Sequence, residues 1–242
     1  MNPIELSDVD AAAFLKSMKG SYFISGIHTD AGKSYCTGWL AAALMAVGKN
    51  VVTQKFVQTG NKDFSEDIEL HRRIMGVEPM DVDLDHTTAP LIFSHPCSPQ
   101  LAARLDRRDI PPEVIDGATR RLLERFEVVL VEGAGGLMVP LTDDFFTADY
   151  VATRRLPLIF VVNGSLGSIN HAVLSFEAIK ARGIEMPLVL YNTHFDYDPL
   201  IADDTRSFIL RYLSRHFPST ALLDVPSLWA CNDKSSGRFV DI

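Results

Sequence analysis

The nine residues Gly26-Ile-His-Thr-Asp-Ala-Gly-Lys-Ser34 have the composition of a loop that binds phosphate. Glycines let backbone N–H groups approach a phosphate closely, and a helix that begins behind them adds the positive end of its dipole. Lys33 would then contact the β- and γ-phosphates of a nucleoside triphosphate, and the Ser34 hydroxyl would bind Mg²⁺. Five residues separate the two glycines, one more than in the usual loop, so the strict pattern fails. The order of strand, loop and helix still predicts a nucleotide site.

Two further groups that suit phosphate chemistry end apolar runs. Glu132 follows Val128–Val131 and precedes Gly-Ala-Gly-Gly136. A carboxylate at the carboxyl end of a strand can hold Mg²⁺, and the glycines after it let a substrate approach. Lys55, in Lys-Phe-Val-Gln-Thr-Gly60, can neutralise a phosphate or a carbamate. The alternatives are a glycine turn capped by Glu132 and a solvated lysine at the end of its strand.

The elements that must position these groups alternate between strands and helices. The interior apolar runs are continuous, which indicates strands buried on both faces of a mostly parallel sheet. We expect one α/β domain over residues 21–230, a leader helix over 1–20 and a polar tail over 231–242. Strands are predicted at 22–26, 51–57, 128–131, 158–162, 187–192 and 221–225. Helices are predicted at 34–47, 65–75, 100–107, 111–126, 147–155, 168–182 and 199–217, with irregular chain over 77–99.

Charge and composition narrow the class of protein. The 242 residues carry 31 acidic and 23 basic side chains, a net charge of -8, which disfavours a nucleic-acid surface. No run approaches the ~18 apolar residues of a membrane span, and the first residues lack the basic region of a secretory signal. Cys36, Cys97 and Cys231 show no zinc spacing and suit a reducing compartment. We expect a cytoplasmic protein that binds neither nucleic acid nor membrane.

The three motifs, in this order and separation, resemble those of the dethiobiotin synthetase family. That family has G-T-D-T-x-x-G-K-T with the same five-residue insertion, then K-P-V-x-[ST]-G and V-E-G-A-G-G. Its L-G-x-I-N-H-[AT] segment is similar to Leu166–Ala172, and an Asn at a strand end matches Asn192. The P-x-S-P segment also matches Pro96–Pro99. The resemblance covers about residues 21–229 and implies a P-loop NTPase-like fold.

The resemblance also implies an activity. Family members convert 7,8-diaminopelargonic acid, CO2 and ATP to dethiobiotin, the penultimate step of biotin synthesis. A substrate amine takes up CO2 as a carbamate, the γ-phosphate transfers to it, and the second amine closes the ring. An ATP- and Mg²⁺-dependent ligase is implied, acting as a homodimer with sites at the subunit interface.

Individual roles follow from the matched positions. Catalytic roles are implied for Lys33, Lys55 and Thr29, and metal binding for Ser34, Asp67 and Glu132, with Glu66 as the rival of Asp67. Nucleotide contacts are implied for His28, Asp30, Ala31, Gly32, Lys33, Ser34, Tyr35, Glu132 and Asn192, the last at the adenine edge. Substrate contacts are implied for Thr29, Lys55, Thr59, Gly133, Ala134, Gly135, Gly136, Gly167, Ser168, Ile169 and Asn170. The last four begin a helix whose N-terminus would take a carboxylate from the partner's substrate; an ordinary capped helix start is the alternative.

The sequence departs from the family pattern at a few positions. His28 stands where the family has Asp, and it either contacts a phosphate or faces solvent. Phe56 replaces Pro, and Gln100 replaces His. Because of His28, one alternative is an inactive relative that binds ATP and the diamine without turnover. An ATPase switch and an amidoligase are further alternatives. The sequence lacks the second loop lysine that such a switch carries, and it lacks the nucleophilic cysteine that an amidoligase requires. The isolated histidines 71, 86, 95, 194 and 216 show no ligand spacing and are expected on the surface or in the core.

Overall fold

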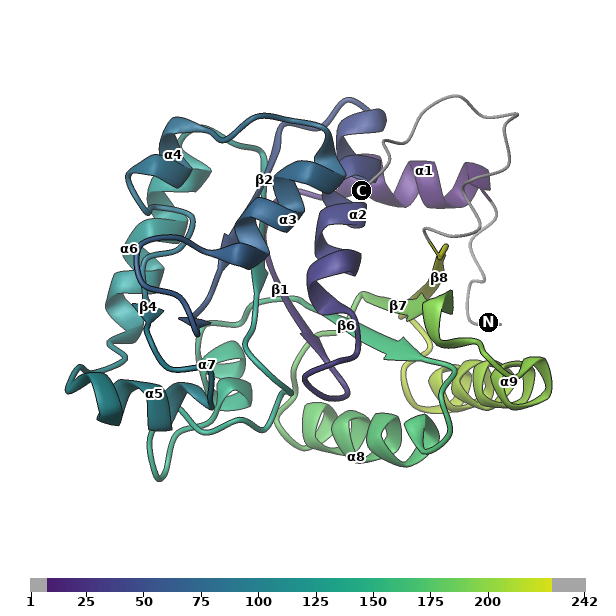
Figure 1. Cartoon of the computed structure of the whole chain (residues 1–242). Helices are drawn as coiled ribbons and strands as arrows, with labels where there is room; N and C mark the ends of the chain where they lie inside the picture. The colour runs from purple at the N-terminus through teal and green to yellow at the C-terminus, as the bar shows by residue number, and fades with distance from the viewer. Residues whose placement is uncertain (1–7, 228–242) are drawn as a thin grey trace.

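The computed structural model describes residues 8–227. Its centre is a six-stranded sheet in the order β2-β5-β1-β6-β7-β8, in which every neighbouring pair is parallel (Figure 1). The α/β fold with a parallel sheet is therefore confirmed. The strands are β1 Gly20–Gly26, β2 Val51–Lys55, β5 Val128–Glu132, β6 Leu158–Asn163, β7 Leu188–Asn192 and β8 Ala221–Val225.

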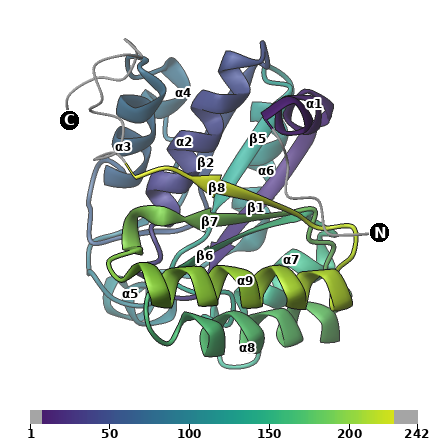
Figure 2. The same cartoon turned by 90° about the vertical axis from the view of Figure 1, so that its right-hand side faces the viewer.

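Helices cover both faces of this sheet. Two of them, α2 and α3, lie together on one face, and α8 and α9 lie together on the other (Figures 1 and 2). This arrangement places the carboxyl ends of the strands at one edge, where sites of open α/β sheets form. The helices are α1 Asp8–Ser17, α2 Lys33–Ala46, α3 Glu66–Met75, α4 Asp81–Leu84, α5 Pro99–Asp106, α6 Pro112–Leu123, α7 Thr147–Thr153, α8 Ser168–Ala181 and α9 Pro199–His216, with the 3-10 turn η1 at Thr193–Phe195.

Several predicted boundaries were wrong. The segment 77–99 is not wholly irregular, because it contains α4 and the short strand β4 (Ile92–Phe93), which pairs with β3 (Gln58–Thr59). The strand predicted to reach residue 57 therefore ends at Lys55, and the chain then joins this second sheet. The leader helix ends at Ser17, since Gly20 already pairs with β5 as the first residue of β1. Residues 1–7 and the predicted tail at 231–242 lie outside the described residues.

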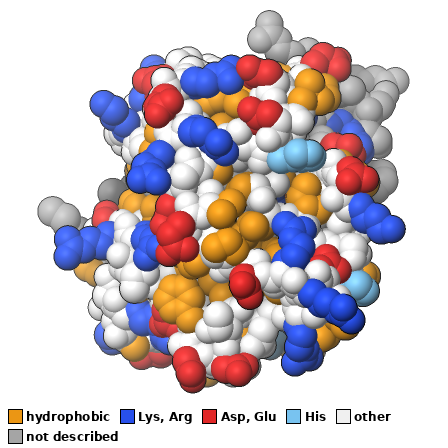
Figure 3. All heavy atoms as spheres, turned by 90° about the vertical axis from the view of Figure 1, so that its left-hand side faces the viewer, with side chains coloured by type: hydrophobic (Ala, Val, Ile, Leu, Met, Phe, Trp, Pro, Cys, Tyr) orange, Lys and Arg blue, Asp and Glu red, His pale blue; other side chains and the backbone are white. Residues whose placement is uncertain are grey.

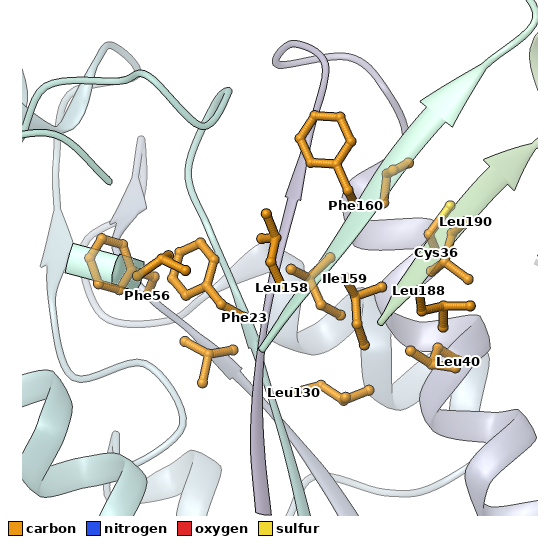
Figure 4. Close-up of a cluster of buried hydrophobic side chains, with 14 of the residues drawn as sticks. Phe23, Cys36, Leu40, Phe56, Leu130, Leu158, Ile159, Phe160, Leu188 and Leu190 are labelled. Carbon is orange, nitrogen blue, oxygen red and sulfur yellow. The ribbon is translucent and has the colours of Figure 1, made fainter. Parts of the chain in front are cut away.

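The core explains why the strands lack alternation. Every residue of β5, β6 and β7 is buried, because helices cover both sheet faces. Phe23 of β1 meets Phe56 edge-on with ring centroids 5.2 Å apart, and Leu40 of α2 lies near Leu188 of β7 (Figure 4). Within residues 8–227, no helix is long and apolar enough to cross a bilayer. On the face shown in Figure 3, acidic and basic side chains are interspersed around hydrophobic ones.

A buried ion pair ties α3 to α4. The Arg72 guanidinium donates to both carboxylate oxygens of Asp83 at 2.9 and 2.8 Å, and its side chain is 3% exposed. Asp83→Ala is expected to lower the free energy of unfolding by about 3–5 kcal/mol, because it leaves a buried charge without its partner. Urea denaturation at pH 7 measures this loss. Asp81 lies two residues before Asp83 and forms an exposed ion pair with Arg125. Asp81→Ala should therefore leave the midpoint of urea denaturation almost unchanged.

The same ion pair predicts an acid limit. Burial alone would raise the pKa of Asp83, but the Arg72 guanidinium and the Met80 N–H lower that pKa below its usual value. Because the folded pKa lies below the unfolded value of about 3.9, the stabilisation is present above that pH and is lost as pH falls through the folded pKa. Wild type and Asp83→Ala should therefore converge in stability on acidification. Curves that stay parallel down to pH 2 would contradict this origin.

Candidate nucleotide and metal site

The loop between β1 and α2 has the geometry of a phosphate cradle. Gly32 caps α2 in the left-handed region, with φ 83°, and no side chain within the described residues caps that end. The start of α2 therefore has the form of a helix N-terminus that binds an anion. Lys33 curls back across the loop, and its Nζ donates to the carbonyls of His28 and Thr29 at 2.9 and 3.0 Å. A phosphate entering the cradle would compete with these two carbonyls for the ammonium.

Four side chains from four elements meet beside this loop. Ser34 Oγ of α2 lies 2.7 Å from Asp67 Oδ1 of α3 and 2.8 Å from Glu132 Oε1 of β5. Lys55 pairs with Glu132 because the β2–β5 register sets these two residues side by side. Its Nζ contacts both Asp67 Oδ2 and Glu132 Oε1, the latter at 2.7 Å. Glu66, the rival of Asp67, is exposed instead.

This donor set fits Mg²⁺. Two carboxylates and a hydroxyl converge, and an ammonium already lies between the carboxylates, so the position favours a cation. Within residues 8–227 no group of three or more His, Cys, Asp or Glu side chains forms a metal cluster of its own. Mg²⁺ normally binds through one or two carboxylates and completes its shell with water and substrate phosphates. The three residues therefore suit a metal that arrives with a nucleotide.

Burial and charge act against each other at this cluster. Burial lowers the pKa of Lys33 from 10.5 to about 8, although Glu132 acts to raise it. Burial alone would also lower the pKa of Lys55, but the carboxylates of Glu132 and Asp67 raise it above its ordinary value. Burial alone would raise the pKa of Glu132, yet Lys55 and His71 hold it well below the usual range. Glu132 is therefore an ionised carboxylate, although its side chain has no exposed surface.

The glycine run after β5 lies against the phosphate loop. A Cβ on Gly133 would stand 2.9 Å from the Phe23 ring, so only glycine passes β1 there. A Cβ on Gly136 would lie 3.6 Å from the carbonyl of Gly26, and one on Gly135 would lie 3.8 Å from Thr29 Oγ1. The run from Gly133 to Gly136 thus borders the same space as Thr29.

The amide of Asn192 has a task in the structure that the sequence did not indicate. Its Nδ2 donates to the carbonyl of Ala31 at 3.2 Å, and its Oδ1 accepts from the His194 N–H at 3.2 Å. Asn192 therefore fastens the end of β7 to the phosphate loop. Contact of Asn192 with an adenine edge stays a prediction. To make that contact, the amide would have to give up its hydrogen bonds to Ala31 and His194.

The remaining predicted residues lie around the cluster. The N-terminus of α8 begins at Gly167 with φ 95°, and Ser168 Oγ donates to Asn163 Oδ1 just before it. His28 is half-buried and stands edge-on to His171 of α8, with ring centroids 5.7 Å apart. Others are placed as follows: Thr29 and Asp30 exposed on the loop, Tyr35 donating to the Pro226 carbonyl, Thr59 in β3, Ala134 in the glycine run, and Ile169 and Asn170 on the first turn of α8.

A cavity of about 330 Å³ opens beside the loop, with mostly apolar walls. It lies between the first turns of α8 and the segment after the glycine run, and Ile27 and Gly136 border it. Its remaining lining residues are Leu137, Met138, Val139, His171, Leu174 and Ser175.

His71 is the contact that the sequence analysis missed. It is buried as a core histidine, and its Nε2 lies 2.7 Å from Glu132 Oε2. It follows Asp67 by four residues, so the two share one face of α3. That spacing was the signal that could have found it.

Gly32→Ala tests the loop geometry. Its Cβ would stand 2.2 Å from Asn192 Nδ2, and φ 83° lies in a region that alanine rarely adopts. Strain of this kind costs roughly 1–3 kcal/mol, so affinity for an ATP analogue should fall about tenfold or more in a fluorescence titration. Gly48→Ala is the matched control, with φ 86° and open space around it. An unchanged affinity in Gly32→Ala would contradict binding at this loop.

A strand, a glycine loop with a terminal lysine, and two carboxylates at the carboxyl edge of a parallel sheet define a P-loop nucleotide-binding protein. A family model described as an AAA domain matches residues 20–235. The ATP-dependent dethiobiotin synthetase BioD 2 of Pasteurella multocida is 42% identical over 82% of this chain and 93% of its own. That of Haemophilus influenzae is 47% identical over 74% and 94%, and the Chlorobaculum tepidum BioD is 43% identical over 87% and 89%. The chain belongs to the dethiobiotin synthetase family.

Proposed function

We propose that this chain catalyses the ATP-dependent formation of dethiobiotin from 7,8-diaminopelargonic acid and CO2. The convergence of Lys33, Ser34, Lys55, Asp67 and Glu132 at one sheet edge carries the proposal. It provides two ammonium groups that can bind anionic oxygens, and beside them two carboxylates that can bind a cation. The similar proteins of Pasteurella multocida and Haemophilus influenzae are ATP-dependent dethiobiotin synthetases, which supports the same reaction and ATP as the nucleotide. We also propose the cytoplasm as the compartment, because ATP is supplied there.

The chemistry needs positioning rather than a covalent enzyme intermediate. The substrate amine attacks CO2 and loses a proton, giving a carbamate. A carbamate oxygen takes the γ-phosphoryl group and ADP leaves, and the second amine then attacks the carbonyl carbon and expels phosphate. Lys33 and Lys55 would hold the γ-phosphate and carbamate oxygens, which repel each other unless cations lie between them.

Mg²⁺ would be held by Ser34, Asp67 and Glu132, and when bound it supplies positive charge to the phosphate oxygens. Lys55 then has two sets of acceptors, the carboxylates that hold it in the structure and the substrate anions. The Lys55 ammonium would exchange part of its contact with Asp67 and Glu132 for the carbamate oxygens.

The diamine has an apolar chain that suits the 330 Å³ cavity. Thr29, Thr59 and the run from Gly133 to Gly136 would contact the amine end. The N–H groups that begin α8 at Gly167 would take the carboxylate of the substrate bound in the partner subunit.

A homodimer forms part of the proposal. Leu166, just before α8, and Leu174, within α8, are 85% and 63% exposed, which offers apolar surface to a second copy. A second copy that covers them would bring its own α8 N-terminus to the shared site. Sedimentation of the full chain, with a Leu174→Glu variant that should dissociate, tests this arrangement.

Phosphate release from Mg-ATP and bicarbonate, with and without 7,8-diaminopelargonic acid, tests the reaction. Diamine-dependent release matched one-to-one by dethiobiotin in mass spectrometry is expected. ATP binding without diamine-dependent phosphate release would overturn the proposal. It would favour the inactive relative, the alternative that His28 in the phosphate loop suggests.

A further inference from the structure

The fold joins the buried carboxylate of Glu132 to a second polar chain on the side away from the nucleotide loop. His71 Nε2 lies 2.7 Å from Glu132 Oε2, and His71 Nδ1 lies 3.0 Å from Thr53 Oγ1 of β2. The His71 and Glu132 side chains both have no exposed surface. Solvent therefore does not compete for either hydrogen bond.

The partners fix the direction of each hydrogen bond. Both oxygens of the ionised Glu132 carboxylate only accept, so His71 Nε2 carries a hydrogen and donates. Arg72 Nη1 donates to Thr53 Oγ1 at 2.9 Å, and a guanidinium has no acceptor. A ring whose single N–H hydrogen is on Nε2 accepts at Nδ1, where the Thr53 hydroxyl is the hydrogen-bond partner. The Glu132 carboxylate thus favours the tautomer with its hydrogen on Nε2, and Thr53 can support that tautomer as a donor to Nδ1.

Each oxygen of Glu132 consequently has a separate task. Oε2 is held by His71, while Oε1 accepts from Ser34 and Lys55. Rotation of the carboxylate would break the His71 hydrogen bond between two side chains that have no exposed surface. The anchor itself is firm, because Arg72 is held by both oxygens of Asp83.

We propose that His71 is a positioning residue that holds Glu132 Oε1 toward Ser34, ready for the Mg²⁺ of a bound nucleotide. This inference rests on the metal site of the proposed function. Residues that hydrogen-bond a metal-binding carboxylate typically change metal affinity by roughly 10–100-fold when removed. A merely structural histidine would instead be replaced by an apolar side chain without effect on the metal.

The test compares variants of the full chain that separate volume from hydrogen bonding. His71→Leu fills the space and removes both hydrogen bonds. His71→Gln keeps an N–H donor toward Glu132. Thr53→Val removes the hydroxyl that meets His71 Nδ1 and, with it, one acceptor of Arg72 Nη1. His216→Leu, at the exposed end of α9, is the matched control. The readout is Mn²⁺ affinity with a non-hydrolysable ATP analogue, by electron paramagnetic resonance, beside analogue affinity in EDTA.

His71→Leu is expected to weaken Mn²⁺ binding by roughly 10–100-fold and leave analogue affinity in EDTA unchanged. His71→Gln should restore most of the metal affinity, and Thr53→Val should show a smaller loss in the same direction. Wild-type Mn²⁺ affinity in His71→Leu, or equal weakening with and without metal, would overturn the proposal. If His71→Leu does not fold, wild-type affinity in Thr53→Val or no retention in His71→Gln overturns it. Absence of dethiobiotin formation by the wild type would overturn the proposed function separately.

Discussion

Lys33→Ala is expected to lower kcat for dethiobiotin formation by roughly 10²–10³-fold or more, because it removes a charge aimed at the transferring phosphate. Lys33 is 4% exposed and already spans the loop to His28 and Thr29, so no other side chain in the described part of the chain occupies its position. Phosphate release under saturating ATP and diamine measures the effect. A variant that keeps a tenth of wild-type turnover would contradict the role assigned to this ammonium.

The stability of the same variant separates function from folding. Burial lowers the pKa of Lys33 to about 8, so the fold disfavours its charged form. Its removal should therefore leave the unfolding midpoint unchanged or raise it. Lys16→Ala on the exposed face of α1 is the control for loss of a lysine, and it should alter neither turnover nor midpoint.

Glu132→Gln is expected to abolish metal-dependent turnover, with a loss of roughly 100-fold or more. The variant preserves volume, but its amide N–H₂ must face either Lys55 or the His71 Nε2–H, and both are donors. The free energy of unfolding should also fall by about 3 kcal/mol, since a buried pair loses one partner. Mn²⁺ binding and urea denaturation measure the two effects.

Glu66→Gln is the matched control for this change. Glu66 is exposed next to Asp67, so its variant should keep wild-type Mn²⁺ affinity and stability. Loss of metal binding in Glu66→Gln, with retention in Asp67→Asn, would reverse the assignment of the metal carboxylate on α3.

The sequence predicted the fold class from burial on both faces of the strands. Continuous apolar runs such as Val128–Val131 require cover on both sides, and helices between parallel strands provide it. The boundary of the strand at 51–57 was wrong because pairing partners, rather than local composition, decide where a strand ends. The backbone N–H of Gln58 bonds to Leu91, more than thirty residues away, and this contact gives no local signal.

Some residues of the candidate site could likewise be predicted from local sequence, and others could not. Gly32, Lys33 and Ser34 are adjacent in the chain, so a local motif suffices to predict their geometry, and Glu132 ends a recognisable strand. The sequence by itself therefore determined the nucleotide loop, the family and the reaction to test. Only the tertiary structure decided that Asp67 rather than Glu66 faces Ser34, that Asn192 fastens the loop, and that His71 contacts Glu132. The reason is physical: the Asp67 and His71 contacts depend on the rotation of α3 against β2 and β5, and the Asn192 contact depends on where β7 ends beside the loop after β1. Packing of the whole sheet sets both, and no local pattern encodes them.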